Sequence, residues 1–224
     1  MIAADYLKQI ASWSRGLNER EVEVTRAGII ERWFKADEFI CARGDQFEYW
    51  TGIVSGLARM GAVSRGGKSI SFVGLTAGAW FGEGSVLKHE ARRYDVIALR
   101  ETRLAMMERA TFLWLFENSV AFNHFLVAQL NERLGQFVGR VEYDRMLDST
   151  ARVARCIASL FNPVLYPNAT RHLEITQEEI GALAGMSRQN ANQCLKTLEK
   201  DGLIRIDYGG LTIVDLDGLR WHGE

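Results

Sequence analysis

The stretch ITQEEIGALAGMSRQNANQCLKTLEK, residues 175–200, predicts two short helices joined by a tight turn. Thr176 is placed to cap the first helix, and Glu179 stands three residues later, where a capping box requires it. Gly185 ends this helix as a left-handed C-terminal residue would, and Ser187 caps the second helix. The apolar residues of the first helix recur at helical spacing: Ile180, Leu183 and Ala184.

The second helix separates a buried stripe from a face of amide and guanidinium groups. The stripe residues are spaced four and three apart: Ala191, Leu195 and Leu198. The exposed side chains are long, flat or forked: Arg188, Gln189, Asn192, Gln193 and Lys196. Such groups carry the donors and acceptors that read base edges in the DNA major groove. We therefore predict a helix-turn-helix whose second helix is the reader; the alternative is a helical hairpin with a merely solvated outer face.

The candidate DNA contacts extend over both helices. They comprise the caps, the start of the first helix and the exposed face of the second: Thr176, Gln177, Ser187, Arg188, Gln189, Asn190, Asn192, Gln193 and Lys196.

Length and charge limit the classes of protein that this chain can belong to. It has 224 residues and a formal net charge of −1. A near-neutral chain is not a general polyanion binder, so any DNA contact must come from a local patch. The region 149–224 is not basic either, because eight Lys/Arg face nine Asp/Glu, which gives −1. This charge is the main observation against DNA binding.

The three cysteines, Cys41, Cys156 and Cys194, are scattered and form no C-x-x-C pair. They indicate a reducing compartment rather than a disulfide framework. Cys194 lies on the reading helix, where a buried thiol is expected in preference to a redox switch. The N-terminus has no signal-peptide core, and no apolar run reaches membrane length. We expect a cytoplasmic protein.

Residues 1–30 have a loose helical stripe, and residues 32–107 then change character because glycines interrupt short apolar runs. The runs expected as strands are 31–39, 49–54, 57–63, 69–75, 79–81 and 96–106. Gly66-Gly67 is a hairpin turn signal. Many short strands with glycine-rich turns predict a sandwich or a barrel-like roll. The interior of such a roll can hold a ligand.

Residues 111–146 return to a helical pattern, with apolar residues spaced four, four, three and four apart: Leu126, Leu130, Leu134, Phe137 and Val141. This is close to a coiled-coil seam, and polar residues that include Arg133 fill the other face. The seam can pack on the chain's own β-roll or on the same helix of a second copy. We favour the second copy, because upstream residues can already make the contact within the chain: Leu115, Phe116, Phe122 and Phe125.

The C-terminal region continues with Asp148, which offers an N-cap to a helix over 149–161 that Asn162-Pro163 stops. After the helix-turn-helix, residues 203–206 and 211–214 predict a hairpin, which behind a reading helix is a wing. The chain is therefore predicted to be an α+β protein of three parts: a jelly-roll-like β-roll effector domain (1–110), a dimerisation helix and hinge (111–147), and a winged-helix DNA-binding domain (148–224).

The order of these parts resembles that of the CRP/FNR family, the cyclic-AMP receptor protein family of bacterial transcription regulators. The resemblance covers residues 34–214, and its strongest local match is ITQEEIGALAGMSRQNANQCLKTLEKDGLI. A second match is AGAWFGEGSVL, residues 77–87, which is similar to the family's G-x-x-F-G-E segment at the phosphate-binding cassette. Gly44, Gly56 and Gly67 fall where the family places turn glycines.

The resemblance implies a β-roll like a cyclic-nucleotide-binding domain, a homodimer and a near-palindromic double-stranded DNA site. Effector binding in the β-roll would reorient the DNA-binding domains through the long helix. RNA polymerase is a candidate further partner. No catalytic activity is implied, and although Glu142 and Asp144 form a candidate acid–base pair, no nucleophile constellation accompanies them.

The effector pocket departs from that of the family's cyclic-AMP binders. In those proteins Gly-Glu meets the ribose, and an Arg followed by two small residues grips the cyclic phosphate. Here Gly82-Glu83 and Arg92 are present, but Arg93 and Tyr94 replace the small residues. Arg92 and Arg93 can bind another anion or can be solvated charges on a loop.

The long helix departs as well, because Phe137 and Val138 align with two hydroxyl residues that meet the purine in those binders. Each lost hydrogen-bond partner costs about 1–3 kcal/mol, so two or three losses remove micromolar affinity. We therefore predict that the chain does not bind cyclic AMP tightly. The candidate effector residues are Gly82, Glu83, Gly84, Ser85, Arg92, Arg93 and Phe137.

Two alternatives remain open. One is a cyclic-nucleotide-responsive regulator that uses Glu83 and Arg92. The other is an effector-independent DNA binder with a dead pocket, meaning a β-roll that binds no effector. The expected effector is a small anion or a nucleotide. An iron–sulfur cluster is not expected, because the first thirty residues contain no Cys. Neither haem nor a metal site is expected, because the four histidines include no pair that can be placed face to face.

The reading helix also departs from the family pattern. Ser187 and Arg188 match it, whereas Gln189 and Gln193 replace an acidic residue and a second Arg. Arg188 can pair bidentately with guanine, and the amides favour adenine or tolerate several bases. We predict a half-site that differs from that of the cyclic-AMP receptor protein.

Overall fold

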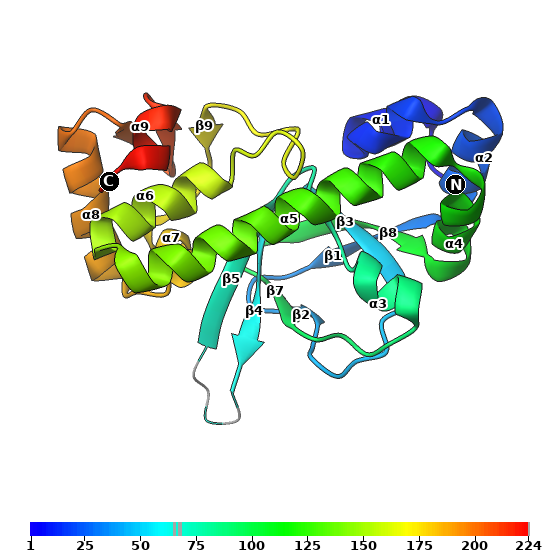
Figure 1. Ribbon diagram of the computed structural model, residues 1–224, viewed down its shortest axis with the longest axis horizontal. Coiled ribbons are helices and arrows are strands. Elements are labelled where there is room, and N and C mark those ends of the chain that lie inside the picture. Colours follow the sequence, from blue (N-terminus) through cyan, green and yellow to red (C-terminus); the bar gives the residue numbers. More distant parts are fainter. Residues whose placement is uncertain (65, 67–68, 224) are drawn as a thin grey trace.

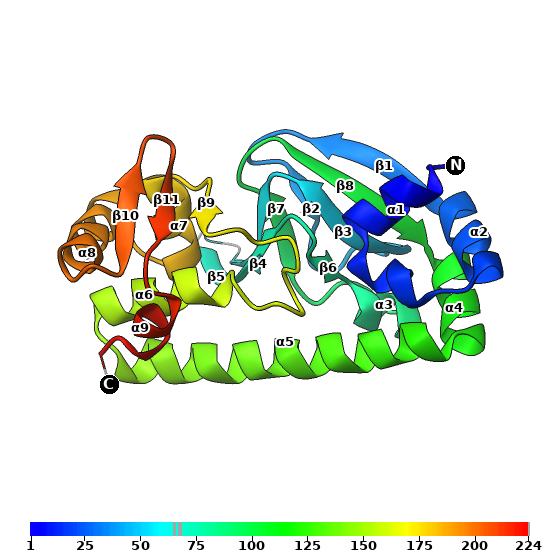
Figure 2. The ribbon, with the colours of Figure 1, turned by 90° about the horizontal axis from the view of Figure 1, so that it is seen from above.

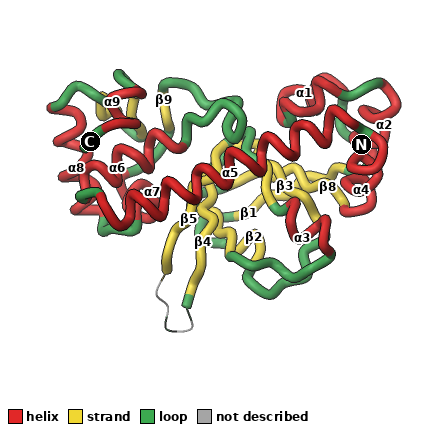
Figure 3. The backbone as a smooth tube through the Cα atoms, viewed as in Figure 1, coloured by secondary structure: helices red, strands yellow, loops and turns green. Residues whose placement is uncertain are grey.

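The computed structural model describes residues 1–64, 66 and 69–223. Helices gather at both ends of the molecule, and the strands of the β-roll lie between them (Figures 1 and 3). The long helix α5 (Val120–Met146) runs along one side of the molecule and joins the two ends (Figure 2). This order of roll, long helix and winged helix is the predicted one.

The N-terminal thirty residues are helical, as predicted. They form α1 (Ala4–Ile10), the 3-10 helix η1 (Ser12–Gly16) and α2 (Glu19–Ala27), which Asn18 begins with a capping box. The ring of Trp13 lies 5.1 Å from that of Trp50 and 5.3 Å from that of Trp80. This aromatic cluster fixes the N-terminal helices on the roll.

The β-roll consists of two four-stranded antiparallel sheets, with strand orders β1-β8-β3-β6 and β2-β7-β4-β5. The strands are β1 (Ile29–Phe34), β2 (Phe39–Cys41), β3 (Tyr49–Ser55), β4 (Leu57–Val63), β5 (Ser69–Thr76), β6 (Trp80–Phe81), β7 (Asp95–Ala98) and β8 (Thr102–Glu108). Apolar side chains from both sheets meet in one core that includes Ile53, Leu75 and Leu104. The predicted turn at Gly66-Gly67 includes Gly67, which lies outside the described residues.

Two predicted strands were wrong, because each is divided by a turn. The run 31–39 forms β1 and β2 in different sheets, and Asp37 between them has a φ of 64°. The run 96–106 forms β7 and β8, also in different sheets. The turn between β7 and β8 passes so close to Gly56 that a Cβ there would lie 2.6 Å from the Glu101 carbonyl oxygen. The short helix α3 (Glu83–Lys88) was not predicted.

The predicted helical stretch is divided at Ser119 into α4 (Arg109–Asn118) and α5. The Ser119 hydroxyl accepts a hydrogen bond from the Phe122 N–H and caps α5. The predicted seam along α5 is partly wrong. Leu126 is buried within the chain, and Phe137 packs on Phe72 of β5, with ring centroids 6.3 Å apart.

The apolar stripe that α5 leaves exposed is rotated from the predicted seam. It keeps three predicted residues and replaces the other two with their C-terminal neighbours: Val127, Leu130, Leu134, Val138 and Val141. The physical reason is that α5 is apolar on two adjacent faces and one of them covers the roll. Arg133, expected on the polar face, is also buried against the roll.

The C-terminal region is a winged helix, as predicted. Its helices are α6 (Ser149–Ser159), α7 (Gln177–Ala184), α8 (Arg188–Lys200) and α9 (Leu216–Trp221). Its sheet has the order β10-β11-β9, from β10 (Ile204–Asp207), β11 (Gly210–Ile213) and β9 (His172–Leu173). Asp148 caps α6 as predicted, and its side chain accepts from the Ala151 N–H at 2.8 Å. The short elements β9 and α9 were not predicted.

The segment that follows α6 joins the roll to α5. Tyr166 is buried in the core of the roll, and its hydroxyl donates to the Gly74 carbonyl oxygen at 2.7 Å. The same hydroxyl accepts from Arg133 at 3.0 Å and from Gln136 at 3.3 Å, both on α5. The roll, the long helix and the segment that leads into the winged helix therefore share one hydrogen-bond network around Tyr166.

Candidate DNA interface and effector site

The helix-turn-helix has the predicted local geometry. Thr176 and Glu179 form the capping box of α7, and the Ser187 hydroxyl accepts from the Asn190 N–H at the start of α8. Gly185 ends α7 with a φ of 69°. At Gly181 a Cβ would lie 2.9 Å from the Met186 carbonyl oxygen, so the tight turn between the helices requires glycine there.

The outer face of α8 is open to solvent, as a reading helix requires. Its predicted apolar stripe is buried: Ala191, Leu195 and Leu198. Cys194 is buried too, as expected for an inert thiol. The predicted contacts on this face are exposed, apart from the half-buried Asn192: Ser187, Arg188, Gln189, Asn190, Gln193 and Lys196. Thr176 is exposed at the start of α7, and Gln177 beside it is half-buried.

The wing is attached to the reading helix by a specific hydrogen bond. The Glu199 carboxylate on α8 accepts from the Ile206 N–H on β10 at 2.7 Å. At the wing tip Tyr208 is fully exposed. A groove of about 570 Å³ lies between the start of α7, Arg188 and the wing. The wing and the reading helix therefore form one continuous exposed surface.

The wing also carries a polar network that keeps its hairpin in shape. The Asp207 carboxylate lies 3.0 Å from Arg205 Nε and accepts from the Thr212 hydroxyl. These two hydrogen bonds, with Thr212 the stronger influence, hold the pKa of Asp207 below its usual value.

Arg92 is the central residue of the predicted effector site. It is 1% exposed, and its Nη2 donates to the Tyr49 carbonyl oxygen at 2.7 Å. Its guanidinium carbon lies 4.9 Å from the ring centroid of Phe47. Among the residues that the structure describes, its Nε and Nη1 have no hydrogen-bond partner. A buried guanidinium with open donors is suited to bind an anion.

The segment around Gly82 surrounds that guanidinium. Gly82 has a φ of 96°, and a Cβ there would lie 2.2 Å from Arg92 Nη1. Glu83 accepts from the amide of Gln129 on α5 at 3.4 Å. The structure thus brings most of the predicted effector residues to one place, which α3 and the residues beside it form: Gly82, Glu83, Gly84, Ser85 and Arg92.

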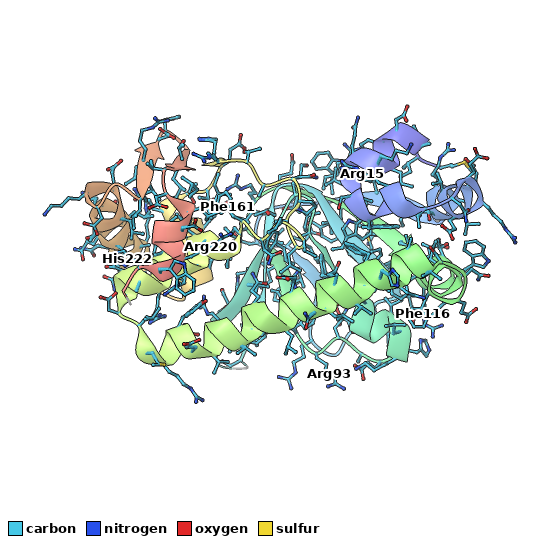
Figure 4. The ribbon with its side chains drawn as sticks, turned by 45° about the horizontal axis from the view of Figure 1, so that its top comes forward. Arg15, Arg93, Phe116, Phe161, Arg220 and His222 are labelled. Atoms are coloured by element: carbon cyan, nitrogen blue, oxygen red, sulfur yellow. The ribbon has the colours of Figure 1, made fainter. Side chains whose placement is uncertain are left out.

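One predicted effector residue, Arg93, does not join this group. Arg93 points into solvent, 73% exposed, and pairs with Glu90 at 3.0 Å (Figure 4). Phe137 packs on Phe72 and, like Phe47 and Tyr94, against the core of the roll. The adjacent Arg92 and Arg93 point apart because Arg92 turns into the roll.

Sequence reasoning missed Arg133 as a site residue. It is 7% exposed on α5, and its Nη2 has no hydrogen-bond partner among the described residues. It lies within electrostatic range of Tyr94, as do Glu83 and Arg92. Burial, followed by the Glu83 carboxylate, raises the pKa of Tyr94 above its usual value. Arg133 stands seven residues, or two helical turns, after the buried Leu126 and so lies on the same face of α5. This spacing was the signal in the sequence that could have indicated its burial.

The described residues contain no group of three or more His, Cys, Asp or Glu side chains placed to hold a metal ion. Across the described part of the chain, no helix combines the length and apolar content needed to cross a membrane.

The N-terminal and C-terminal parts of the chain each match the model of a known domain family. Residues 31–119 match the family model of the cyclic nucleotide-binding domain, and residues 151–221 match that of the Crp-like helix-turn-helix domain. The chain is 26% identical over 198 residues to the cyclic AMP receptor protein of Thermus thermophilus, which covers 88% of this chain and 90% of that protein. It is 28% identical over 184 residues to the cAMP-activated global transcriptional regulator Vfr of Pseudomonas aeruginosa, covering 78% and 85% respectively.

A solved structure supports the fold. FixK2 from Bradyrhizobium japonicum superimposes with a TM-score of 0.70 at 16% identity, over 85% of this chain and 95% of that chain. Vfr is named as a transcriptional regulator, which agrees with the expectation that the chain is not an enzyme. With both domain models matched in order and joined by a long helix, this chain belongs to the CRP/FNR family of transcription regulators.

Proposed function

We propose that this protein is a homodimeric, sequence-specific DNA-binding regulator that responds to a small anionic effector in its β-roll. The observation that carries the proposal is the outer face of α8, where Arg188 and the amides of Gln189, Asn190 and Gln193 are exposed to solvent. Side chains of this kind discriminate base pairs in the major groove.

The dimer rests on the exposed stripe of α5. Its residues are spaced three, four, four and three apart from Val127 to Val141, which spans two heptads and is close to the spacing of a two-stranded coiled coil. A contiguous apolar stripe on the surface is costly unless a partner covers it. A second α5 on this stripe gives the molecule two reading helices, which face half-sites about 34 Å apart.

The effector proposal rests on the buried Arg92, whose Nε and Nη1 have no hydrogen-bond partner among the described residues. Both nitrogens can donate to a bound anion. Tyr94 packs against the roll core where the family's cyclic-AMP binders have a small residue. The purine-facing positions on α5 are Phe137, packed on Phe72, and the exposed Val138. These differences favour an anion other than cyclic AMP.

Thermal-shift titration with inorganic pyrophosphate and with cyclic AMP tests the effector site, because a ligand that binds the folded state raises the unfolding temperature. We expect pyrophosphate to stabilise the wild-type protein and to have little effect on Arg92→Gln. A cyclic-AMP shift abolished by Arg92→Gln would instead support the cyclic-nucleotide alternative. No shift with either compound would favour a dead pocket.

Gel-shift measurement with operator DNA tests the reading face independently of any effector. RNA polymerase as a partner of the DNA-bound dimer is part of the same proposal. A supershift of the operator complex by purified polymerase is the expected result.

A further inference from the structure

Glu199 lies in the last turn of the reading helix α8, where a carboxylate has an electrostatic cost. The carbonyl groups at the C-terminal end of a helix carry partial negative charge, and the DNA phosphates that a reading helix approaches are negative too. The position therefore suits a cation better than an anion. A specific contact made by the Glu199 carboxylate offsets these repulsions.

That contact is with the wing. The Glu199 carboxylate accepts from the Ile206 N–H at 2.7 Å, and β10 lies next to α8 in Figure 2. Ile206 stands opposite Leu211 in a hairpin whose two-residue turn is closed by Asp207 and Gly210. The pair that closes such a turn is hydrogen-bonded, and bonded and non-bonded pairs alternate along an antiparallel ladder. The Ile206 N–H therefore points away from β11, and Glu199 supplies the acceptor that β11 cannot.

This hydrogen bond anchors the wing close to its tip. At the root of the wing, the Leu203 N–H donates to the Leu198 carbonyl oxygen at 3.0 Å, five residues before Tyr208. Ile206 lies only two residues before Tyr208. Because Tyr208 is fully exposed, its hydroxyl can meet a group outside the chain. The position of that hydroxyl relative to α8 therefore depends on Glu199.

The wing tip and the reading helix line the same groove of about 570 Å³, through Tyr208 and Arg188. Tyrosine side chains contact DNA phosphates, and such contacts fix the register of a protein on the duplex. Two carboxylates also line the groove. That of Asp207 is hydrogen-bonded within the wing, and Glu178 is exposed to solvent at the start of α7. A contact through the tyrosine hydroxyl needs no free cation in this groove.

We propose that Glu199 is a positioning residue for DNA recognition. It holds the wing at a fixed distance from Arg188, so that Tyr208 meets a phosphate beside the base pairs that Arg188 reads. Glu199 acts through the wing and makes no DNA contact of its own. The inference rests on the proposed DNA-binding function and adds the wing to it.

Two variants of equal charge and similar length test the hydrogen bond. Glu199→Gln and Glu199→Met both remove the negative charge, but only the glutamine has an oxygen that accepts from the Ile206 N–H. The probe is the duplex that the wild-type protein enriches most from a random pool. In gel shifts we expect Glu199→Met to bind it about fivefold more weakly than Glu199→Gln, which is the effect of one lost hydrogen bond.

A double-mutant cycle tests whether Glu199 acts through the wing tip. Tyr208→Ala removes the residue that makes the proposed phosphate contact. In that background Glu199→Gln and Glu199→Met should bind the duplex alike, because residues that act together are not additive. Glu117→Gln and Glu117→Met, at an exposed glutamate on α4, are the matched controls and should also bind alike.

Ethylation interference separates positioning from stability. Ethylation of the phosphate that Tyr208 contacts should weaken binding by the wild-type and Glu199→Gln proteins but not by Glu199→Met. A loss of stability alone would weaken binding and leave the interference pattern unchanged.

Three results would each overturn the proposal. They are equal affinity of Glu199→Gln and Glu199→Met, a difference between them that persists with Tyr208→Ala, and an unchanged interference pattern in Glu199→Met. If the wild-type protein enriched no duplex, the proposed function itself would fail and this inference with it, so the two failures are distinguishable.

Discussion

Arg100 and Glu179 form a bidentate ion pair that connects the β-roll to α7, the first helix of the helix-turn-helix. Arg100 Nε lies 2.7 Å from Oε1 of Glu179, and Nη2 lies 2.6 Å from Oε2. Nη2 also donates to the Glu174 carbonyl oxygen at 2.8 Å. Because Oε2 of Glu179 also accepts from the Thr176 N–H at 2.6 Å, one carboxylate serves both the capping box and the contact between domains.

We expect Arg100→Met to loosen the DNA-binding region from the roll. Loss of charged hydrogen bonds of this kind costs about 1–3 kcal/mol when the remaining partner is poorly solvated, and the Glu179 side chain is only 9% exposed. Limited proteolysis at the α5–α6 junction measures the effect, and cleavage should be faster in the variant.

The matched control for that experiment is Arg103→Met. Arg103 pairs with Glu31 at 2.6 Å and is about as exposed as Arg100, but both residues of this pair belong to the roll. It should leave cleavage at the α5–α6 junction unchanged. If the two variants are cleaved alike, Arg100 does not fix the arrangement of the domains.

The revised stripe on α5 predicts different effects for substitutions at two leucines eight residues apart: loss of the dimer at one and loss of stability at the other. Leu134→Glu places a charge on the 62% exposed position and should convert dimers to monomers in sedimentation velocity. Leu126→Ala empties a buried position and should lower the free energy of unfolding by about 2–5 kcal/mol. A Leu134→Glu protein that remained dimeric would contradict the exposed stripe as the dimer contact.

Arg188→Ala tests base reading by α8. It should cost about 1–3 kcal/mol of binding free energy and relax preference at one base position. Lys88→Ala, at the end of α3 and outside the winged helix, serves as the control. A gel-shift series in which Arg188→Ala binds as tightly and as selectively as wild type would refute its assignment as a reader.

The thiol of Cys41 should resist alkylation in the folded protein. Burial raises its pKa to about 11, so about one thiol in a thousand is ionised at pH 8. The folded pKa lies above the unfolded value, so its contribution to stability is present below pH 9 and is lost as pH rises through 11. Mass spectrometry after iodoacetamide treatment at pH 8 should find Cys41 unmodified until denaturant is added; rapid labelling of native protein would contradict this.

The sequence was sufficient for features that local chemistry determines. The capping box at Thr176 and the left-handed Gly185 depend on neighbours within a few residues, so the helix-turn-helix was predicted in detail. The division of 96–106 into β7 and β8 depends on contact with Gly56, more than forty residues away. Short elements such as α3 and β9 give too few residues for a periodic pattern.

Long-range contacts also explain the errors at the site and on α5. Spacing identified an apolar helix but not which face the roll covers, so Leu126 and Phe137 were placed at the dimer seam. Charged side chains are rarely buried without partners, and therefore neither the burial of Arg92 nor that of Arg133 followed from the pattern. Arg92 and Arg93 are adjacent in the chain, and only packing decides which of them turns inward.

The most direct measurement is selection of bound duplexes from a random DNA pool by the purified protein, followed by sequencing. The account predicts an inverted repeat with half-site centres about 10 base pairs apart. The half-sites should differ from those of the cyclic-AMP receptor protein, because Gln189 and Gln193 replace its acidic and arginine readers. Recovery of that receptor's own consensus would contradict the account of specificity, and a single unrepeated half-site or no enrichment would contradict the dimeric DNA-binding regulator itself.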